Sequence, residues 1–189
     1  MHEKVTVYSE YREQASVQLQ PGDIIIFKSN MHNSISRAFN WGLHLLEKNW
    51  DRWGWHTGYI SEIMPDGSII TAESLQHEGV RTVIYPCLEA LGEVRVYRWL
   101  DTLDVSALRD FTLEHVGSPY DVACYLWTSI QRLFVAISHR LLPRKIDDRY
   151  TCWELVCAMA RSMQKPLQPI EQYPIITDME RALESTRIL

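Results

Sequence analysis

Short hydrophobic runs alternate with polar turns over the first hundred or so residues, a pattern typical of β-strands. The run Ile24-Ile25-Ile26-Phe27 is rich in β-branched residues and predicts a strand buried on both faces. Met64-Pro65-Asp66-Gly67 separates two further runs and predicts a tight turn between paired strands. We therefore expect strands over residues 23–27, 56–63, 68–73, 80–85 and 94–99, in a sheet of about five mostly antiparallel strands.

Apolar residues recur at helical spacing in much of the rest of the chain. Leu108 and Phe111 follow a capping residue, Asp104 or Ser106, and Gly117 marks the end of that helix. Further helices are expected over residues 33–48, 122–142 and 152–165. Strands that come early and helices that come late predict an α+β fold, in which helices pack on the sheet.

Length and composition suit one globular domain. The chain has 189 residues, of which 46% are hydrophobic and 23% charged, and typical domains hold about 100 to 200 residues. We expect a single domain over residues 1–189, with an N-terminal extension at 1–20 and a C-terminal extension at 166–189. A net charge of −5 and the lack of a Lys/Arg cluster argue against a nucleic-acid partner.

Cysteine usage and hydrophobic segments bear on where the chain works. The four cysteines have no paired C-x-x-C spacing, which indicates reduced thiols. The N-terminus lacks the apolar run of a signal peptide, so a cytoplasmic location is the default expectation. The apolar stretch 122–142 contains Arg132 and Arg140 and therefore predicts a buried or surface-docked helix rather than a membrane span.

Cys152 is expected at the start of a helix. Thr151 precedes it, and Glu154 follows at the spacing of a Thr-x-x-Glu capping box. The N–H groups and the positive dipole end of a helix start favour the thiolate, the nucleophilic form of cysteine. Taken alone, a cysteine beside Trp153 and close to Leu155 is more typical of core packing. Residues elsewhere in the chain decide between these two interpretations.

A histidine and a carboxylate in the expected hairpin complete a candidate catalytic set. His56 begins the first strand, and its small neighbours leave room for a general base. A loop of two or four residues would pair Glu73, on the second strand, with Ile60 or Gly58. Either pairing puts Glu73 on the sheet face of His56, where it could orient the imidazole. A loop of three residues would put it on the opposite face.

Other residues offer weaker alternatives. His44, His77 and His115 are expected to be surface residues. A zinc site built from His56, His77 and Cys87 lacks the short paired-ligand motif of such sites. The sequence contains neither a Gly-x-Ser-x-Gly elbow nor a phosphate-cradling glycine loop. We therefore expect no metal and no other cofactor.

Five short motifs follow one another in an order that resembles a known family. They are Gly22-Asp23-Ile24-Ile25, His56-Thr57-Gly58-Tyr59, Ala72-Glu73, Gly117-Ser118-Pro119-Tyr120-Asp121 and Tyr150-Thr151-Cys152-Trp153-Glu154-Leu155-Val156. This order resembles the circularly permuted NlpC-type papain-like cysteine hydrolases, the YiiX-like group, over roughly residues 20–165. In ordinary members of that superfamily the cysteine helix precedes the histidine strand. In the permuted group, as here, the histidine comes first.

The resemblance implies a papain-like (NlpC-type) fold in circularly permuted order and a role for each matching residue. Cys152 matches the nucleophile, His56 the base and Glu73 the polar third member. Tyr120 is expected near the thiol, and Thr151 supports the helix start.

Two tryptophans are expected to bind substrate. Trp55 belongs to the Trp-rich stretch 50–55, which could wall a cleft or roof the core. Trp153 occupies the position after the cysteine, which is usually small in the resembling family. This departure bears directly on which substrates the site would accept.

The implied activity is that of a cysteine peptidase or amidase. Such a thiol hydrolase would cleave a peptide-type amide bond through a thioacyl intermediate, with bacterial cell-wall peptides as the substrate class. One alternative is a lipid acyltransferase or phospholipase related to lecithin retinol acyltransferase, which shares the histidine-before-cysteine order and could touch a membrane through residues 122–142. Another is a non-catalytic binding module on the same fold. The expected partner is a peptide or acyl-containing substrate.

Overall fold

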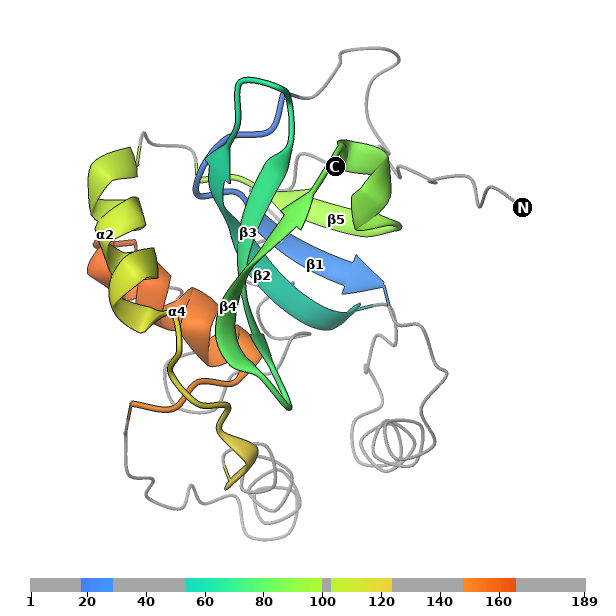
Figure 1. Cartoon of the computed structure of the whole chain (residues 1–189). Coiled ribbons are helices and arrows are strands. Elements are labelled where there is room, and N and C mark those ends of the chain that lie inside the picture. Colours follow the sequence, from blue (N-terminus) through green and yellow to red (C-terminus); the bar gives the residue numbers. More distant parts are fainter. Residues whose placement is uncertain (1–17, 29–53, 100–102, 124–147, 166–189) are drawn as a thin grey trace, which may run out of the picture.

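The computed structural model describes residues 18–28, 54–99, 103–123 and 148–165. Strands occupy the first part of these ranges and helices the last part, as Figure 1 shows. The elements are β1 (Ile24–Lys28), β2 (Gly54–Ile63), β3 (Ile69–Leu75), β4 (Gly79–Tyr85), the 3₁₀ helix η1 (Leu88–Leu91), β5 (Val94–Tyr97), α2 (Val105–His115) and α4 (Cys152–Ser162).

The strands form one five-stranded sheet in the order β4-β3-β2-β1-β5. Each neighbouring pair is antiparallel. The sheet and its two helices confirm the α+β class and all five predicted strands, whose ends differ from the expected ones by at most a few residues. The helices expected over 33–48 and 122–142 lie outside the described residues, apart from the first two positions of the second.

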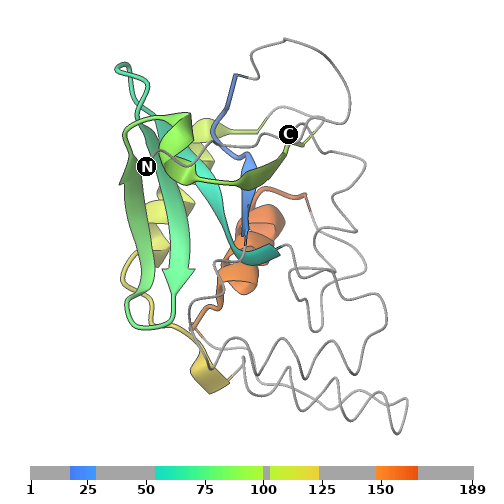
Figure 2. The same ribbon diagram turned by 90° about the vertical axis from the view of Figure 1, so that its right-hand side faces the viewer.

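Both helices cover the same face of the sheet (Figures 1 and 2). Ile24, Ile26 and Tyr59 point from the sheet into this layer and are at most 1% exposed. Burial of such side chains stabilises the fold by about 1.5–3 kcal/mol each. The helices contribute the other side of this core, namely Leu108 and Phe111 of α2 with Leu155, Val156, Met159 and Ala160 of α4.

The opposite face carries a second, smaller core. Ile25, Ile60 and Val96 are fully buried there, together with Leu19, Ile69, Leu91 and Val94. Because successive side chains of a strand point to opposite faces, the unbroken apolar run of β1 supplies both cores, as its composition predicts.

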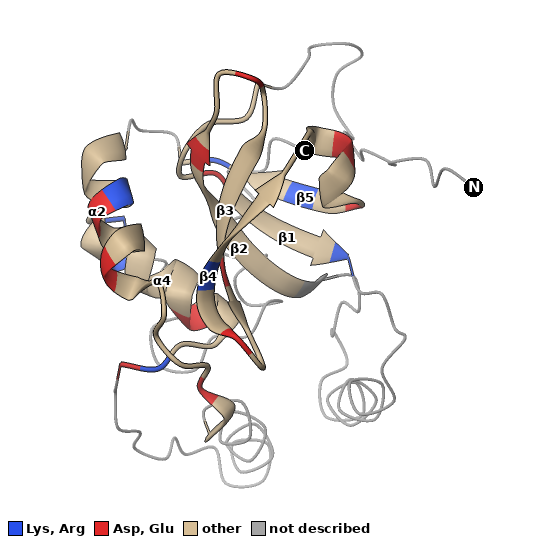
Figure 3. Cartoon of the chain, in the orientation of Figure 1, with Lys and Arg blue, Asp and Glu red and all other residues tan. Residues whose placement is uncertain are grey.

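A buried ion pair fixes the chain just before β1. Asp23 is 1% exposed and receives hydrogen bonds from Arg98 Nε at 2.8 Å and Arg98 Nη2 at 2.7 Å. The backbone N–H of Gln20 donates to the same carboxylate at 2.8 Å. Elsewhere, acidic and basic side chains are interspersed along the described elements (Figure 3).

Candidate active site

Cys152 is the first residue of α4, and the predicted capping box is present. The backbone N–H of Glu154 donates to Thr151 Oγ1 at 3.4 Å, and the backbone N–H of Thr151 donates to Glu154 Oε2 at 3.0 Å. Thr151 is fully buried and Cys152 is 4% exposed. The cap fixes where the helix starts and therefore where the thiol lies relative to the sheet.

His56 is the third residue of β2, a strand that contacts α4. Its side chain is 16% exposed, and the Cys152 side chain is close enough to raise its pKa. On β1, Phe27 lies opposite His56 in the register, and the two rings stack with centroids 5.4 Å apart. The strand and the aromatic neighbour together restrict the orientation of the imidazole.

Glu73 completes the set from β3. Its Oε2 accepts a hydrogen bond from His56 Nε2 at 2.7 Å, and the residue is 3% exposed. Since an ionised carboxylate can only accept, Nε2 carries the proton and Nδ1 is the nitrogen available to Cys152. The structure thus brings together the three residues that sequence reasoning selected for the catalytic roles.

Gly58 leaves the space that this arrangement needs. It lies opposite Glu73 in the β2–β3 register. A Cβ at this position would lie 2.8 Å from Glu73 Cγ and 2.7 Å from the Ala72 carbonyl oxygen. Because neither backbone nor buried carboxylate can move away freely, a side chain here would displace Glu73 from His56.

The hairpin loop and a bulge together set the face on which Glu73 lies. Gly67, with φ +87°, donates to the Met64 carbonyl, and the Met64 N–H donates to the Ser68 carbonyl, which leaves a three-residue loop, Pro65 to Gly67. By itself this loop would place Glu73 on the face opposite His56. A register shift between Ile60 and Glu62 restores the match, so that Glu73 pairs with Gly58.

His56 and Glu73 form a hydrogen-bonded pair, and hydrogen bonding outweighs burial in setting the pKa of each. Burial lowers the pKa of His56, but hydrogen bonds and charge attraction from Cys152 and Glu73 raise that pKa from 6.5 to about 9. Burial raises the pKa of Glu73, but hydrogen bonds from His56, Thr71 and Tyr85 and the charge of His56 hold it below its ordinary value. At neutral pH the pair is therefore an imidazolium and a carboxylate.

The pair makes stability depend on pH. The folded-state pKa of His56 lies above its unfolded value, so its contribution is fully present below pH 6.5 and is lost as pH rises through about 9. A shift of this size corresponds to on the order of 3 kcal/mol. We expect the unfolding free energy of the wild type, measured by urea denaturation, to fall over this range relative to a His56→Gln variant. Parallel curves for the two proteins would contradict this assignment.

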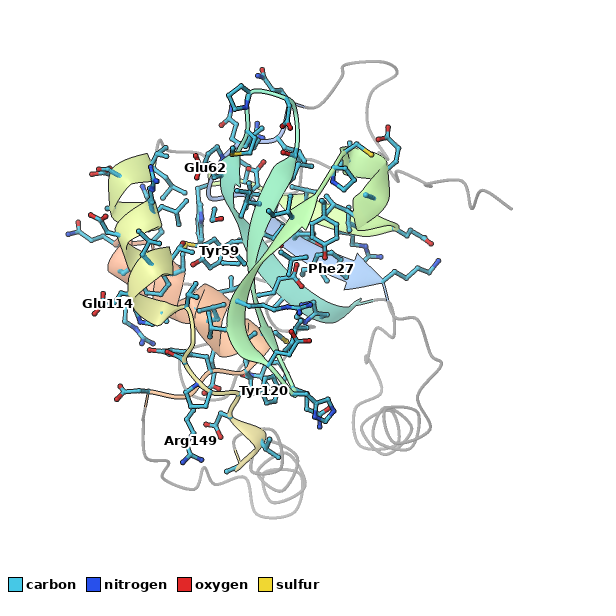
Figure 4. The ribbon with its side chains drawn as sticks, viewed as in Figure 1. Phe27, Tyr59, Glu62, Glu114, Tyr120 and Arg149 are labelled. Carbon is cyan, nitrogen blue, oxygen red and sulfur yellow. The ribbon has the colours of Figure 1, made fainter. Side chains whose placement is uncertain are left out.

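Tyr120 comes from the loop that follows α2. The backbone of this loop pairs with the residue before Thr151: the Tyr150 N–H donates to the Pro119 carbonyl at 3.1 Å, and the Asp121 N–H donates to the Tyr150 carbonyl at 3.4 Å. Tyr120 is half-buried and lies in Figure 4 at the end of the molecule where α4 begins. The loop thus runs beside the start of the Cys152 helix.

The two tryptophans expected to bind substrate have different placements. Trp153 is 6% exposed and belongs to the core between sheet and helices, so most of its surface is in packing contacts. The side chain of Trp55 lies outside the described part of the structure, although its backbone belongs to β2. Cys157 is half-buried on the same helix as Cys152, and the described cysteines form no disulfide with one another.

Three neighbours of the His56–Glu73 pair were not predicted from the sequence. Thr71 Oγ1 donates to Glu73 Oε1 at 2.5 Å, Tyr85 Oη donates to the same oxygen at 3.1 Å, and Phe27 stacks on His56. Thr71 could have been found, because it lies two residues before Glu73 and so shares its sheet face. Tyr85 could be found only from the register between β3 and β4, and Phe27 only from the register between β1 and β2. No short motif reveals either register.

The alternative histidines do not join this site. His115 Nδ1 bonds to the Phe111 carbonyl at 2.8 Å, and its ring stacks on Phe111. His77 and Cys87 are both exposed. His44 lies outside the described residues. Among the residues that the structure describes, no group of three His, Cys, Asp or Glu side chains could hold a metal ion, so the zinc alternative finds no support there.

Neither a scan against protein-family models nor a search of curated proteins returned a match for this chain.

Within the described ranges, no helix has both the length and the apolar character needed to cross a membrane.

Proposed function

We propose that the protein is a thiol hydrolase of the cysteine peptidase or amidase type, acting through Cys152, His56 and Glu73. One observation carries the proposal: His56 bonds the Glu73 carboxylate at 2.7 Å and is electrostatically coupled to the Cys152 side chain, which helps to raise its pKa. A nucleophile, a base and a group that orients the base, in contact in that order, are what nucleophilic acyl transfer requires. The permuted order of the motifs and their resemblance to NlpC-type hydrolases support the same conclusion.

The reaction begins at the Cys152–His56 pair. The thiol proton is held by His56 in this pair, so that a thiolate lies beside an imidazolium, which Glu73 stabilises through Nε2. The thiolate attacks the carbonyl carbon of an amide, and a C–S bond forms. When the tetrahedral intermediate collapses, the C–N bond breaks and His56 gives its proton to the departing amine.

Water completes the cycle. His56, now neutral, takes a proton from a water molecule whose oxygen attacks the thioacyl carbon. The C–S bond breaks, the acid product leaves, and the thiolate–imidazolium pair forms again. Throughout, the carbonyl oxygen carries the developing negative charge. The backbone N–H of Cys152, at the helix start, is the natural donor to that oxygen, and the Tyr120 hydroxyl is a second candidate donor.

The substrate class follows from the resemblance rather than from the contacts of the site. Peptide-type amides, including bacterial cell-wall peptides, are the substrates that the resembling family suggests. Lipid esters are the competing class, since they react through the same thioacyl chemistry. The substrate assignment is therefore a separate question from the identity of the catalytic residues.

Capture of the thioacyl intermediate tests the function. The full chain is incubated at neutral pH with p-nitrophenyl acetate, quenched in acid and examined by peptide mass spectrometry. We expect the acetyl group on Cys152 well before it appears on exposed Cys87. Equal labelling of the two thiols would contradict the proposal. A second arm compares peptide amides with phospholipid vesicles: turnover of the amides alone supports the amidase, and turnover of the lipid alone supports the acyltransferase.

A further inference from the structure

We propose that Tyr85 is a positioning residue of this site, whose hydroxyl holds Glu73 in the orientation that directs His56 toward Cys152. The inference rests on the proposed function. Tyr85 is the last residue of β4 and lies opposite Ile69 in the register. No sequence motif includes it, and it contributes no atom to the reaction itself.

The two carboxylate oxygens of Glu73 have separate partners. Oε2 receives the bond from His56 at 2.7 Å. Oε1 receives bonds from Thr71 Oγ1 at 2.5 Å and Tyr85 Oη at 3.1 Å. Rotation of the carboxylate away from His56 would break all three bonds inside a site where Glu73 is 3% exposed. Such a loss is costly because a buried charged group has no water to replace its partners.

The ring of Tyr85 is also linked to His56 through Phe27. It contacts Phe27, with ring centroids 6.3 Å apart, and Phe27 in turn stacks on His56. The hydroxyl therefore acts on the protonation and tautomer of His56 through Glu73, whereas the ring acts on its position. A Tyr85→Phe variant removes the first effect and retains the second.

The charges around Glu73 determine what the hydroxyl contributes. His56 faces it from β2, and Cys152 lies beyond His56 at the start of α4. Arg81 lies opposite Glu73 on β4 but forms an ion pair with Glu78. Donors to Oε1 stabilise the carboxylate, and the carboxylate stabilises the imidazolium. Loss of one donor should therefore lower the pKa of His56 and make the thiolate–imidazolium pair less favourable.

The test measures His56 directly in the full chain with the Tyr85→Phe variant. The imidazole Cε1–H resonance, assigned by its absence from His56→Gln, is followed by NMR through a pH titration. We expect the midpoint to move from about 9 toward 6.5, by about one pH unit, and alkylation of Cys152 by iodoacetamide at pH 7 to slow by up to about tenfold. A role limited to packing would change neither measurement.

Tyr59→Phe is the matched control. It also removes a tyrosine hydroxyl, a buried one that bonds Thr112 Oγ1 at 3.0 Å away from the site, and should leave both measurements unchanged. If the wild type alkylates Cys152 selectively and Tyr85→Phe matches it in rate and midpoint, the role of Tyr85 is overturned while the proposed function stands. If the wild type shows no selective reaction at Cys152, the proposed function fails and the inference fails with it.

Discussion

Cys152→Ala is expected to abolish both hydrolysis and the selective acylation of the chain. The physical reason is that no other described thiol combines a helix start with a histidine whose pKa it raises. Cys87 is exposed but lies outside the site, and Cys157 lies in the same helix on a different face. Measured as kcat/KM, the loss should be complete, since the proposed reaction proceeds through a bond to this sulfur.

Alkylation measured separately at each cysteine tests the role of Cys152 most directly. Exposure alone predicts that Cys87, which is exposed, reacts with iodoacetamide faster than Cys152, which is 4% exposed. Activation by His56 predicts the opposite order at neutral pH. Peptide mass spectrometry distinguishes the two orders within one sample, with Cys87 as the internal reference. Faster reaction at Cys87 would contradict the activation of Cys152.

Cys157→Ala is the control for the loss of a thiol from α4. It should leave hydrolysis and the alkylation of Cys152 within about twofold of the wild type, because substitutions outside the site change transition-state stabilisation little. Both alanine variants should keep the cooperative thermal unfolding of the wild type. Full hydrolysis by folded Cys152→Ala would remove Cys152 from the mechanism altogether.

Local signals in the sequence predicted the parts of the site that depend on a few adjacent residues. The Thr151–Glu154 capping box is complete within four consecutive positions, and the helix begins where that motif places it. The Pro65-Asp66-Gly67 turn likewise joins the two strands that its composition indicated. These features need no tertiary context, since the side chain and its backbone partner are neighbours in the chain.

The sheet face on which Glu73 lies could not be predicted in the same way. Three-residue loops were expected to put Glu73 on the wrong face, and the loop does have three residues. The register shift near Ser61 reverses that outcome, and the Ser61 hydroxyl donates to the Ile70 carbonyl at 3.1 Å. A β-bulge depends on the packing of both strands, so its position is not encoded in the turn. The pairing with His56 was correct, but for a reason that the loop alone does not supply.

Contacts between distant strands were the least predictable part. Tyr85 meets Glu73 only because β3 and β4 pair with Ile69 opposite Tyr85. Phe27 meets His56 only because β1 lies beside β2. Neither residue differs in sequence context from an ordinary strand aromatic. Register between strands is set by the whole buried face, so a single position carries little information about it.

His56→Gln is expected to lower kcat/KM by about 10²–10⁴-fold, the usual contribution of a general base. Glutamine is chosen because its amide can still donate to Glu73, whereas alanine would leave that buried carboxylate without the bond at 2.7 Å. The amide cannot accept and return a proton, so the thiol loses its activation while the fold keeps its hydrogen bond. Selective alkylation of Cys152 at neutral pH should be lost as well.

His115→Gln is the control that shows whether the loss of kcat/KM in His56→Gln reflects lost proton transfer. His115 also packs against aromatic rings, 4.0 Å from Phe111 and 5.2 Å from Tyr150 between centroids, and Tyr150 lies just before the Cys152 helix. It is not bonded to the thiol among the contacts described for it, so its replacement should change kcat/KM by less than about tenfold, the scale of lost packing. Equal losses in the two variants would mean that His56 supports the fold around Cys152 rather than the proton transfer. A loss confined to His56→Gln, with unfolding curves that match the wild type above pH 9, assigns the proton to this imidazole.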